Sequence, residues 1–347
     1  MNDSAPKQQP HGWLILDKPR GLGSTQAVGA VKRNLRTAGY GKVKVGHGGT
    51  LDPLAEGVLP IALGEATKLA GRMLDSDKIY EFTIQFGEQT DTLDTEGEVI
   101  ERSDHRPPRA VIPAICEHFT GEIEQVPPKY SAIKVDGKRA YDRARAGEEV
   151  EMATRAVTIY SLSPVRPEPV EGPNGDAEQL RPSAGSARTE LLSSFQTTTG
   201  RPDPYDPSAP LELADSVTLV AHVSKGTYIR SLARDIAHAL GTVGHVTYLR
   251  RIKAGPFVQE QAISLDMLEE IGKGARLEDH LLPLEAGLDG IPALSLDPDS
   301  AQAARQGRVI SGLPQPDGLY FAKLGDVPVA LMEVSDGSAR VVRGFNV

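Results

Sequence analysis

The sequence predicts an α+β protein built on a mixed, mostly antiparallel sheet with flanking helices, followed by a small β domain. Apolar segments with strand and helix periodicity follow one another irregularly, unlike the strict strand–helix alternation of a parallel α/β fold. Residues 310–347 contain short apolar runs separated by frequent glycines, which predicts a small barrel-like β domain at the C-terminal end. The chain of 347 residues, 39% apolar and 24% charged, is long enough to bury more than one core.

The first half of the chain supplies three predicted strands. Short apolar runs at residues 12–16 and 58–63 predict two of them. In residues 78–86 every second residue from Tyr80 onward is aromatic or aliphatic, which is the period of a half-buried strand. Helical spacing of apolar residues or helix-favouring composition predicts helices at residues 25–36, 65–74, 107–119 and 139–149.

The second half adds two strands, at residues 155–162 and 216–223, on either side of an unusual segment. That segment, residues 163–214, contains nine prolines and four glycines and has no apolar periodicity. Such a stretch cannot bury enough surface to offset its ordering entropy, so we interpret it as a mostly disordered insertion. Further helices are predicted at residues 228–240, 264–272 and 298–306.

These elements divide the chain into four expected parts. A flexible N-terminus at residues 1–10 precedes a main domain at residues 11–262, which includes the insertion. A helical connector at residues 263–290 then leads to the small β domain at residues 291–347.

Cysteine content and the length of apolar runs narrow the classes of function. Cys116 is the single cysteine, so no internal disulfide can form, and no Cys/His cluster has zinc-like spacing. We therefore expect a reducing, cytoplasmic environment and no structural metal. The first residues lack the apolar core of a signal peptide, and no run approaches 18 apolar residues, so neither secretion nor membrane insertion is expected.

The net charge of −9 disfavours a nucleic-acid partner at first sight, but the charge is unevenly distributed. Residues 1–50 carry +6 and residues 222–256 carry +5, whereas residues 265–300 carry −7. Phosphate binding needs only a local basic patch, so the two basic segments are compatible with an RNA partner, with the acidic segment facing away. A solvated surface with uneven charge is the alternative.

One segment, GHGGTLDPLAEG at residues 46–57, presents a single aspartate, Asp52, after three glycines. An aspartate before proline is disfavoured from helical geometry, and glycines allow a sharp turn or a close approach to a ligand. The segment therefore predicts a carboxylate held on a constrained loop. A tight turn with Asp52 as a helix N-cap is the alternative. A nucleotide-phosphate loop is disfavoured, because neither a Lys-Ser/Thr pair at the required spacing nor a GxGxxG pattern is present.

Seven blocks of the chain resemble the TruB-type tRNA pseudouridine synthases in sequence and in order. They are LDKPRG at 16–21, GHGGTLDPLAEGVLPIALGEATK at 46–68, DSDKIYEF at 75–82, TDTLDTEGE at 90–98, QVPPKYSAIKVDGKRAYDRARAGEEV at 125–150, SKGTYIRSLARDIAHALG at 224–241 and HVTYLRR at 245–251. The chain departs from the family pattern at Gly23 and Gly48, where serine or threonine is usual, and at Glu56, which replaces a smaller residue. The insertion has no counterpart in the family, and Gly48 is expected to loosen the loop before Asp52.

The resemblance implies a tRNA pseudouridine synthase that isomerises the T-loop uridine, position 55 of tRNA. It also implies the pseudouridine synthase fold for residues 11–262, a PUA-like C-terminal domain, and a monomer that binds the tRNA T stem-loop without an obligate protein partner. Related RNA-guided enzymes need protein partners, but the C-terminal part here has no long basic tail. Moving the link from N1 to C5 of uracil needs no redox change and no group donor, so no cofactor is expected.

Three residues match the family's catalytic positions. Asp52 matches the aspartate that attacks C1′ or deprotonates C2′ once the base has flipped out of the stack. Tyr80 matches the aromatic that stacks on the flipped base and handles a proton, although core packing is the plain alternative. Arg230 matches the arginine that pairs with the aspartate and keeps it ionised in a buried pocket. The alternative is an ordinary arginine on the surface of a charged helix.

Three further residues match substrate-binding positions. His47 matches the residue that fills the space of the flipped base, with an exposed loop histidine as the alternative. Tyr228 and Leu249 match pocket residues, and for Leu249 core packing is the alternative. We interpret the acidic run at residues 91–97 as a solvated turn, because it lacks the full ligand pattern of a calcium loop. Arg250, Arg251 and Lys253 are expected beside the pocket on the RNA-facing surface.

Two other classes of function compete with the enzyme. A non-catalytic RNA-binding or tRNA-folding protein would not need Asp52, Tyr80 and Arg230 together, because a carboxylate repels phosphates. A glycoside or nucleoside hydrolase usually needs a pair of carboxylates, and Glu56 is the only other acid in the Asp52 loop. Release of free uracil from RNA would favour the hydrolase.

Overall fold

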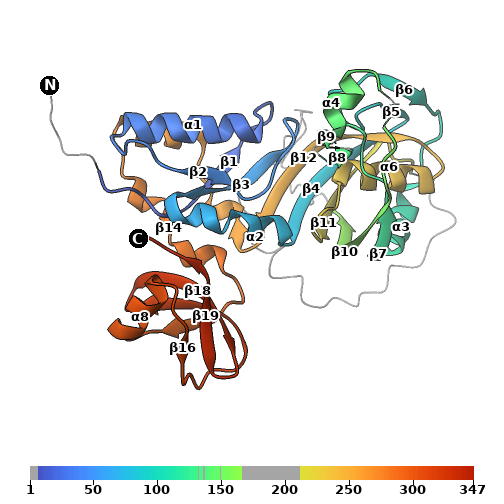
Figure 1. Ribbon diagram of the computed structural model, residues 1–347. Coiled ribbons are helices and arrows are strands. Elements are labelled where there is room, and N and C mark those ends of the chain that lie inside the picture. Colours follow the sequence, from blue (N-terminus) through green and yellow to red (C-terminus); the bar gives the residue numbers. More distant parts are fainter. Residues whose placement is uncertain (1–6, 132, 136, 149, 166–211) are drawn as a thin grey trace, which may run out of the picture.

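A ten-stranded mixed sheet forms the centre of the molecule in the computed structural model (Figure 1), which describes residues 7–131, 133–135, 137–148, 150–165 and 212–347. The order is β14-β1-β3-β12-β4-β11-β10-β7, with β2 beside β3 and β13 beside β12. The strands are β1 (Gly12–Lys18), β2 (Val45–His47), β3 (Glu56–Leu63), β4 (Lys78–Phe86), β7 (Gly121–Gln125), β10 (Arg155–Pro164), β11 (Ser216–Val223), β12 (Gly244–Ala254), β13 (Phe257–Val258) and β14 (Leu281–Leu282). Among these pairs β3 and β12 run parallel and the others antiparallel, so the predicted fold class is confirmed.

The period-two pattern of β4 places this strand at the middle of the sheet. Its bounds match the predicted residues 78–86, and β11, its neighbour, matches the predicted residues 216–223. Phe82, Ile84 and Phe86 are buried on one face, in register with β11 and β12 on either side. Alternation of apolar residues thus orients the strand that also carries Tyr80.

Helices cover one face of this sheet. They are α1 (Ser24–Thr37), α3 (Ile112–His118), α6 (Ile229–Ala239) and α7 (Leu265–Lys273), and residues of each belong to the same apolar cluster as Leu14, Phe82 and Leu249. Figure 1 shows α1 and α6 over different parts of the sheet. The shared core holds both helices against strands that carry predicted site residues.

Three predicted helices are shorter in the structure. Residues 107–119 form a 3-10 turn (Arg109–Val111) followed by α3. Residues 65–74 form a 3-10 turn (Gly64–Lys68) and then α2 (Ala70–Asp75), because the Thr67 hydroxyl bonds the Gly64 carbonyl at 2.7 Å and competes with helical bonding. Residues 139–149 form α4 (Ala140–Arg145), which follows the short hairpin of β8 (Lys134–Val135) and β9 (Lys138–Arg139). This helix ends at Arg145, and Gly147, two residues later, has a φ of 74° in the left-handed region that follows many helix ends.

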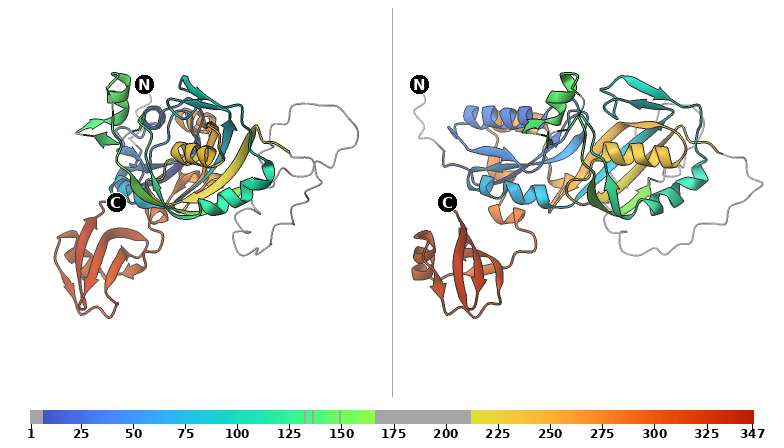
Figure 2. Two further views of the ribbon diagram at one scale, coloured as in Figure 1. Left: turned by 90° about the vertical axis from the view of Figure 1, so that its right-hand side faces the viewer. Right: turned by 45° about the vertical axis from the view of Figure 1, so that its right-hand side comes forward.

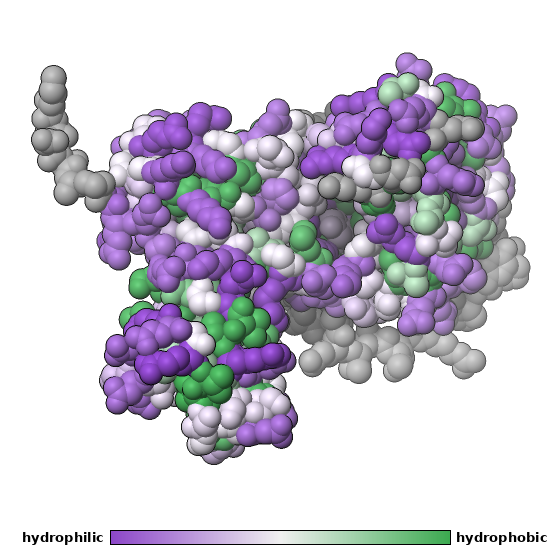
Figure 3. Space-filling model, viewed as in Figure 1, coloured by the Kyte–Doolittle hydropathy of each residue, from purple (hydrophilic) through white to green (hydrophobic). Residues whose placement is uncertain are grey.

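A second, five-stranded sheet forms the C-terminal part and packs against the opposite face of the main sheet. Its order is β15-β17-β18-β19-β16, made of β15 (Ala293–Ser295), β16 (Ile310–Ser311), β17 (Gly318–Leu324), β18 (Val327–Ser335) and β19 (Ser338–Gly344), with α8 (Pro298–Arg305) beside it. Trp13 and Phe257 of the main sheet share an apolar cluster with Phe321 and Phe345. The two views of Figure 2 show this sheet set apart from α1 by the main sheet. In Figure 3 the visible face is largely hydrophilic, with hydrophobic residues gathered on part of the C-terminal sheet.

Residues 263–290, the expected helical connector, contain α7, two 3-10 turns and the short strand β14, which pairs with β1. The predicted insertion lies almost entirely outside the described residues, and its first two residues, Ser163 and Pro164, belong to β10. Most of the expected flexible N-terminus also lies outside them. Among the described residues, none of the helices has the length and apolar character needed to cross a membrane.

Candidate active site

A cavity of about 340 Å³ opens where the Asp52 loop, β4, β12 and the start of α6 meet. Five of the six predicted site residues line it: Asp52, Tyr80, Tyr228, Arg230 and Leu249. They come from segments far apart in the sequence, and the sheet order brings these segments together. Its size lies in the usual range of ligand pockets.

The Asp52 loop, residues 48–55 between β2 and β3, is tightly anchored. The Gly48 amide donates to the Pro60 carbonyl at 2.8 Å. The Ser24 hydroxyl at the start of α1 receives a hydrogen bond from the Leu51 amide at 2.8 Å and contacts the Leu51 carbonyl at 2.9 Å. Leu51 and Leu54 are buried in the core below. The expected constrained loop is therefore present, and since β3 follows it, Asp52 caps no helix.

The Arg230 guanidinium holds the Asp52 carboxylate at the cavity. Arg230 Nη2 lies 2.7 Å from Asp52 Oδ2, and this nitrogen also donates to the Tyr130 carbonyl at 3.0 Å. The arginine side chain is 5% exposed, whereas that of Asp52 is 39% exposed. In the described structure Oδ1 of Asp52 has no hydrogen-bond partner, so one carboxylate oxygen is fixed and the other is free to act on a ligand in the cavity that Asp52 lines.

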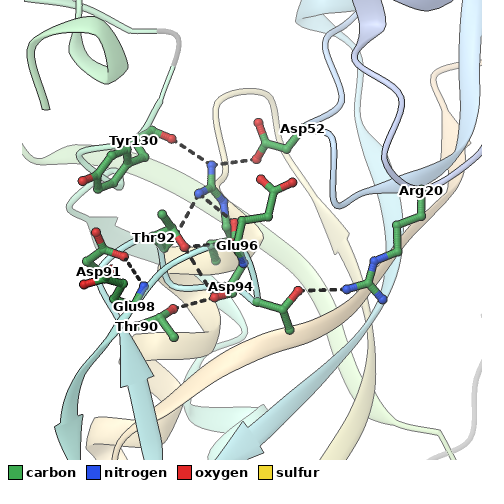
Figure 4. A network of polar contacts seen from close by, with 11 residues as sticks. Arg20, Asp52, Thr90, Asp91, Thr92, Asp94, Glu96, Glu98 and Tyr130 are labelled. Carbon is green, nitrogen blue, oxygen red and sulfur yellow. Dashed lines mark hydrogen bonds and ion pairs between the residues drawn. The ribbon is translucent and has the colours of Figure 1, made fainter. Parts of the chain in front are cut away.

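A second carboxylate, Asp94, binds the other side of the same guanidinium. Its Oδ2 lies 3.1 Å from Arg230 Nη1, which also donates to the Thr92 carbonyl at 2.8 Å, as Figure 4 shows. Asp94 Oδ1 accepts hydrogen bonds from the Thr92 hydroxyl at 2.6 Å and the Glu96 amide at 2.9 Å. The prediction of a solvated acidic turn is therefore wrong for Asp94, which is 1% exposed between β5 (Glu88–Thr90) and β6 (Val99–Arg102).

The walls of the cavity combine aromatic and aliphatic residues with polar ones, which include Lys78, Thr227 and Arg251. Tyr80 is partly buried on β4, next to Arg251 in the register with β12. Leu249 is 6% exposed and therefore contributes both to the core and to the cavity. The Gln125 side chain fixes the backbone of Tyr228. Its Oε1 accepts from the Tyr228 amide at 2.8 Å, and its Nε2 donates to the Tyr228 carbonyl at 3.2 Å. Burial raises the pKa of the Tyr228 hydroxyl, so this residue is neutral near pH 7.

His47 lies on β2 and is not one of the residues that line the cavity. It is half-buried, and its Nδ1 atom is buried without a hydrogen-bond partner in the described part of the chain. Burial, followed by the nearby Arg251 charge, lowers the pKa of His47. The imidazole is therefore neutral near pH 7 and offers shape rather than charge.

Three cations expected on an RNA-facing surface instead make internal contacts. Arg250 pairs with Glu56 at 3.2 Å, and Lys253 lies 3.4 Å from Asp77. Arg251 is 1% exposed and binds backbone carbonyls. Arg251 lines the cavity, as expected, but it is too buried to join an outer RNA-facing surface, so that part of its prediction is wrong. Arg250 and Lys253 are partly buried and paired with acids, which a charge count along the sequence does not reveal.

Comparison with known proteins gives the same family along nearly the whole chain. Residues 33–171 match the family model described as TruB family pseudouridylate synthase (N terminal domain), and residues 230–289 match tRNA pseudouridylate synthase B C-terminal domain. A protein of Novosphingobium aromaticivorans named tRNA pseudouridine synthase B is 59% identical over 96% of this chain and 97% of its own length. The protein of that name from Zymomonas mobilis is 51% identical over 99% and 98%. The chain belongs to the TruB family.

Solved structures support the TruB-type fold. A chain in a structure titled "Structure of H/ACA RNP bound to a substrate RNA containing 2'-deoxyuridine" aligns with a TM-score of 0.62 over 97% of this chain and 86% of its own length, at 22% identity. A chain of a Cbf5-Nop10-Gar1 complex gives 0.61 over 97% and 84%, at 23% identity. At such identities the likeness shows the fold alone.

Proposed function

We propose that this TruB-family protein isomerises uridine 55 in the T-loop of tRNA to pseudouridine. The observation that carries this function is the half-exposed Asp52 carboxylate, which a buried arginine holds at the mouth of a base-sized cavity. The target base must leave the helical stack to reach it, at a cost of a few kcal/mol. Fixing the carboxylate beforehand removes the need to orient it during the reaction.

Asp52 acts on the ribose in this reaction. Its Oδ1 atom either attacks C1′ or removes the proton from C2′, and in both routes the N1–C1′ bond breaks and the electron pair leaves with uracil. The freed base turns and C5 bonds to C1′. In the first route this displaces the Asp52 oxygen from C1′, and in the second C2′ regains its proton from Asp52. C5 then loses its proton and N1 gains one. Atoms and electrons balance within the substrate, so the isomerisation consumes no other reactant. Arg230 orients the carboxylate and offsets its charge.

The remaining residues hold the base and the RNA. Tyr80 stacks on the flipped uracil and lies near the proton transfer at C5, while Tyr228 and Leu249 form the opposing walls. His47 fills the space that the base leaves, and its neutral ring is suited to stacking there. We further propose that residues 11–262 form the catalytic domain and residues 291–347 a separate PUA-like domain.

The proposed enzyme acts on tRNA as a monomer in the cytoplasm, without an obligate protein partner. A hydrolase with paired carboxylates is disfavoured, because Glu56 binds Arg250 at 3.2 Å and does not line the cavity. Release of free uracil from RNA would reverse that preference.

Mapping pseudouridine in unmodified tRNA transcripts after incubation with the pure protein tests this function. We expect a single modified site at position 55 without any added cofactor. Asp52→Asn should abolish the reaction while tRNA affinity stays within about tenfold, since phosphate contacts dominate binding. Substantial turnover by Asp52→Asn would remove the carboxylate from the mechanism, and modification elsewhere would contradict the assigned target.

A further inference from the structure

Arg251 is among the largest fully buried side chains, at 1% exposure, yet no ion pair joins it to a carboxylate in the described residues. Its guanidinium instead binds backbone carbonyls: Nε donates to Val58 at 2.8 Å, Nη2 to Gly49 at 3.2 Å, and Nη1 contacts Thr50 at 3.5 Å. Burying an arginine without an acidic partner is costly, so its presence calls for an explanation.

The acceptors of these bonds explain where the arginine acts. Gly49 and Thr50 lie three and two residues before Asp52 in the same loop, and Val58 is a buried residue of β3. Arg251 extends from β12, which carries Leu249 of the cavity wall. One side chain therefore ties the near side of the Asp52 loop to the two strands beneath the cavity.

The close fit around Arg251 depends on two glycines. Gly57 has a φ of 98°, and a Cβ there would lie 2.3 Å from the Arg251 carbonyl oxygen, so β3 and β12 could not approach. Gly49 has a φ of 130°, a backbone conformation that side-chain-bearing residues rarely adopt, and a Cβ there would lie 3.6 Å from Arg251 Nη1. Two glycines of the Asp52 region thus serve contacts with Arg251.

A guanidinium suits this task better than any other side chain. Its planar fork presents donors in several fixed directions, so it can bind carbonyls of two separate segments at once. A lysine in its place would keep the charge but offer one compact ammonium that cannot span the three acceptors. The positive charge of Arg251 also affects neighbouring groups, because it contributes to the lowered pKa of His47, Lys18 and Lys78.

We propose that Arg251 is a positioning residue of the isomerase, which sets the place of Asp52 by holding the carbonyls of Gly49 and Thr50 against β3. Arg230 fixes the carboxylate itself, and Arg251 fixes the backbone that carries it. This inference rests on the proposed function, because it assigns Asp52 the reaction that Arg251 supports.

Steady-state kinetics of Arg251→Lys and Arg251→Met with tRNA transcripts test the proposal. We expect kcat to fall about 100-fold in both, the loss typical of a misplaced reacting group, while KM stays within about threefold. Arg250→Met is the matched control: it removes the neighbouring arginine of β12, which binds Asp17 and Glu56. We expect it to lower the melting temperature and leave kcat near that of the wild type.

An NMR titration of the His47 imidazole separates the effect of the Arg251 charge from the effect of its hydrogen-bonding geometry. The pKa of His47 should rise in Arg251→Met and stay low in Arg251→Lys, although both lose turnover. Wild-type kcat in a folded Arg251→Lys would overturn the proposal, as would an equal loss in Arg250→Met. Loss of the cooperative melting transition in Arg251→Lys would also overturn it, by assigning Arg251 to overall folding. Inactive wild-type protein would instead contradict the proposed function.

Discussion

Gly48 lies where the side chain of Met73 leaves no space for another. A Cβ at residue 48 would lie 2.7 Å from Cβ and 2.9 Å from Cγ of Met73, which extends from α2 into the apolar cluster between the two sheets. The backbone of Gly48 is held at the same time by Pro60. The expectation that this glycine loosens the loop is therefore wrong. Where TruB-type proteins usually have serine or threonine, Met73 supplies the missing volume.

Gly48→Ser should destabilise the protein, and Met73→Gly, which removes both the Cβ and the Cγ that would clash, should relieve part of that cost. Gly48→Ser should lose about 1–3 kcal/mol of unfolding free energy by overpacking. Met73→Gly should lose about 3–5 kcal/mol by leaving a cavity and a glycine in α2. The double variant should be more stable than the sum predicts, with a coupling of at least about 1 kcal/mol. A double-mutant cycle by denaturant unfolding measures this. Losses that add within about 0.5 kcal/mol would show that the two residues do not compensate.

At the scale of single residues the sequence predicts the residues that meet at the cavity, but not the buried charged residues that hold them in place. Asp52 and Arg230 stand in recognisable motifs, and they meet at 2.7 Å. Asp94 and Arg251 stand in runs of charge that are typical of solvated surface, yet both are buried. Burial of a charge depends on partners far along the chain, which composition and periodicity do not specify.

The turn between β5 and β6 supports α6 through Asp94, so neutralising this acid should reach the active site indirectly. Asp94→Asn keeps the size of the side chain but removes the charge that faces the Arg230 guanidinium. We expect the melting temperature to fall, with a loss of about 3 kcal/mol typical of a broken buried pair. We also expect kcat to fall about 10–100-fold because Arg230 no longer holds Asp52 in place.

Asp91→Asn is the matched control for this turn. Asp91 accepts a hydrogen bond from the Glu98 amide at 3.0 Å (Figure 4), and it is not among the hydrogen-bond or ion-pair partners of Arg230 in the described residues. This variant should keep kcat within about threefold of the wild type. Equal effects of the two substitutions on kcat would mean that the turn acts through its general stability rather than through Arg230.

The end of α2 gives a pH dependence of stability. The buried Lys78 amino group donates to the carbonyls of Leu74 and Ser76, and burial lowers its pKa from 10.5 to about 8. Between these values the unfolded chain binds the proton and the folded chain does not. The contribution of Lys78 to stability therefore rises as pH rises through this window, and below it the contribution is constant and unfavourable.

Lys78→Met should flatten the curve of unfolding free energy against pH between about 8 and 10. The slope should fall by up to about 1.4 kcal/mol per pH unit relative to the wild type, as one titrating group allows. Lys225→Met is the control, since Lys225 is exposed and pairs with Asp75 at the surface. Denaturant unfolding over this pH range measures all three slopes. A slope in Lys78→Met equal to that of the wild type would contradict the assignment.

At the scale of whole helices and strands, the sequence predicts an element best when the burial of one of its faces determines its position. The strands at 78–86 and 216–223 match because alternation fixes both period and bounds. The helix expected at 65–74 breaks because a threonine hydroxyl competes for a backbone carbonyl, a local bond that apolar spacing does not encode. The position of β14 against β1 depends on tertiary pairing between residues more than 260 apart, which no local pattern contains.

At the scale of the molecule, charge is less segregated than the sequence suggests. The acidic helix α7 packs directly beside the basic helix α1, through apolar residues that include Leu268 and Ile271. Glu269 and Arg33 line the groove between the two helices. The expectation that residues 265–300 face away from the basic segments is therefore wrong for α7. The cations of α1 that lie outside this groove, Lys32 and Arg36, are the better candidates for phosphate contacts.

Binding of tRNA should weaken steeply with salt, although the protein is acidic overall. Each neutralised phosphate contributes about 0.7–0.9 to the log–log slope, so Lys32→Glu with Arg36→Glu should lower both the affinity and the slope, by about 1–2 units in the latter. The modified uridine should stay the same, because phosphate contacts position the RNA and the cavity selects the base. Lys273→Glu with Arg276→Glu makes an equal charge change at the exposed end of α7, and filter binding across salt concentrations compares the two. We expect the α7 variant to bind nearly as the wild type does. Equal losses would indicate a general charge effect, and binding that is flat with salt would mean that stacking and shape alone hold the tRNA.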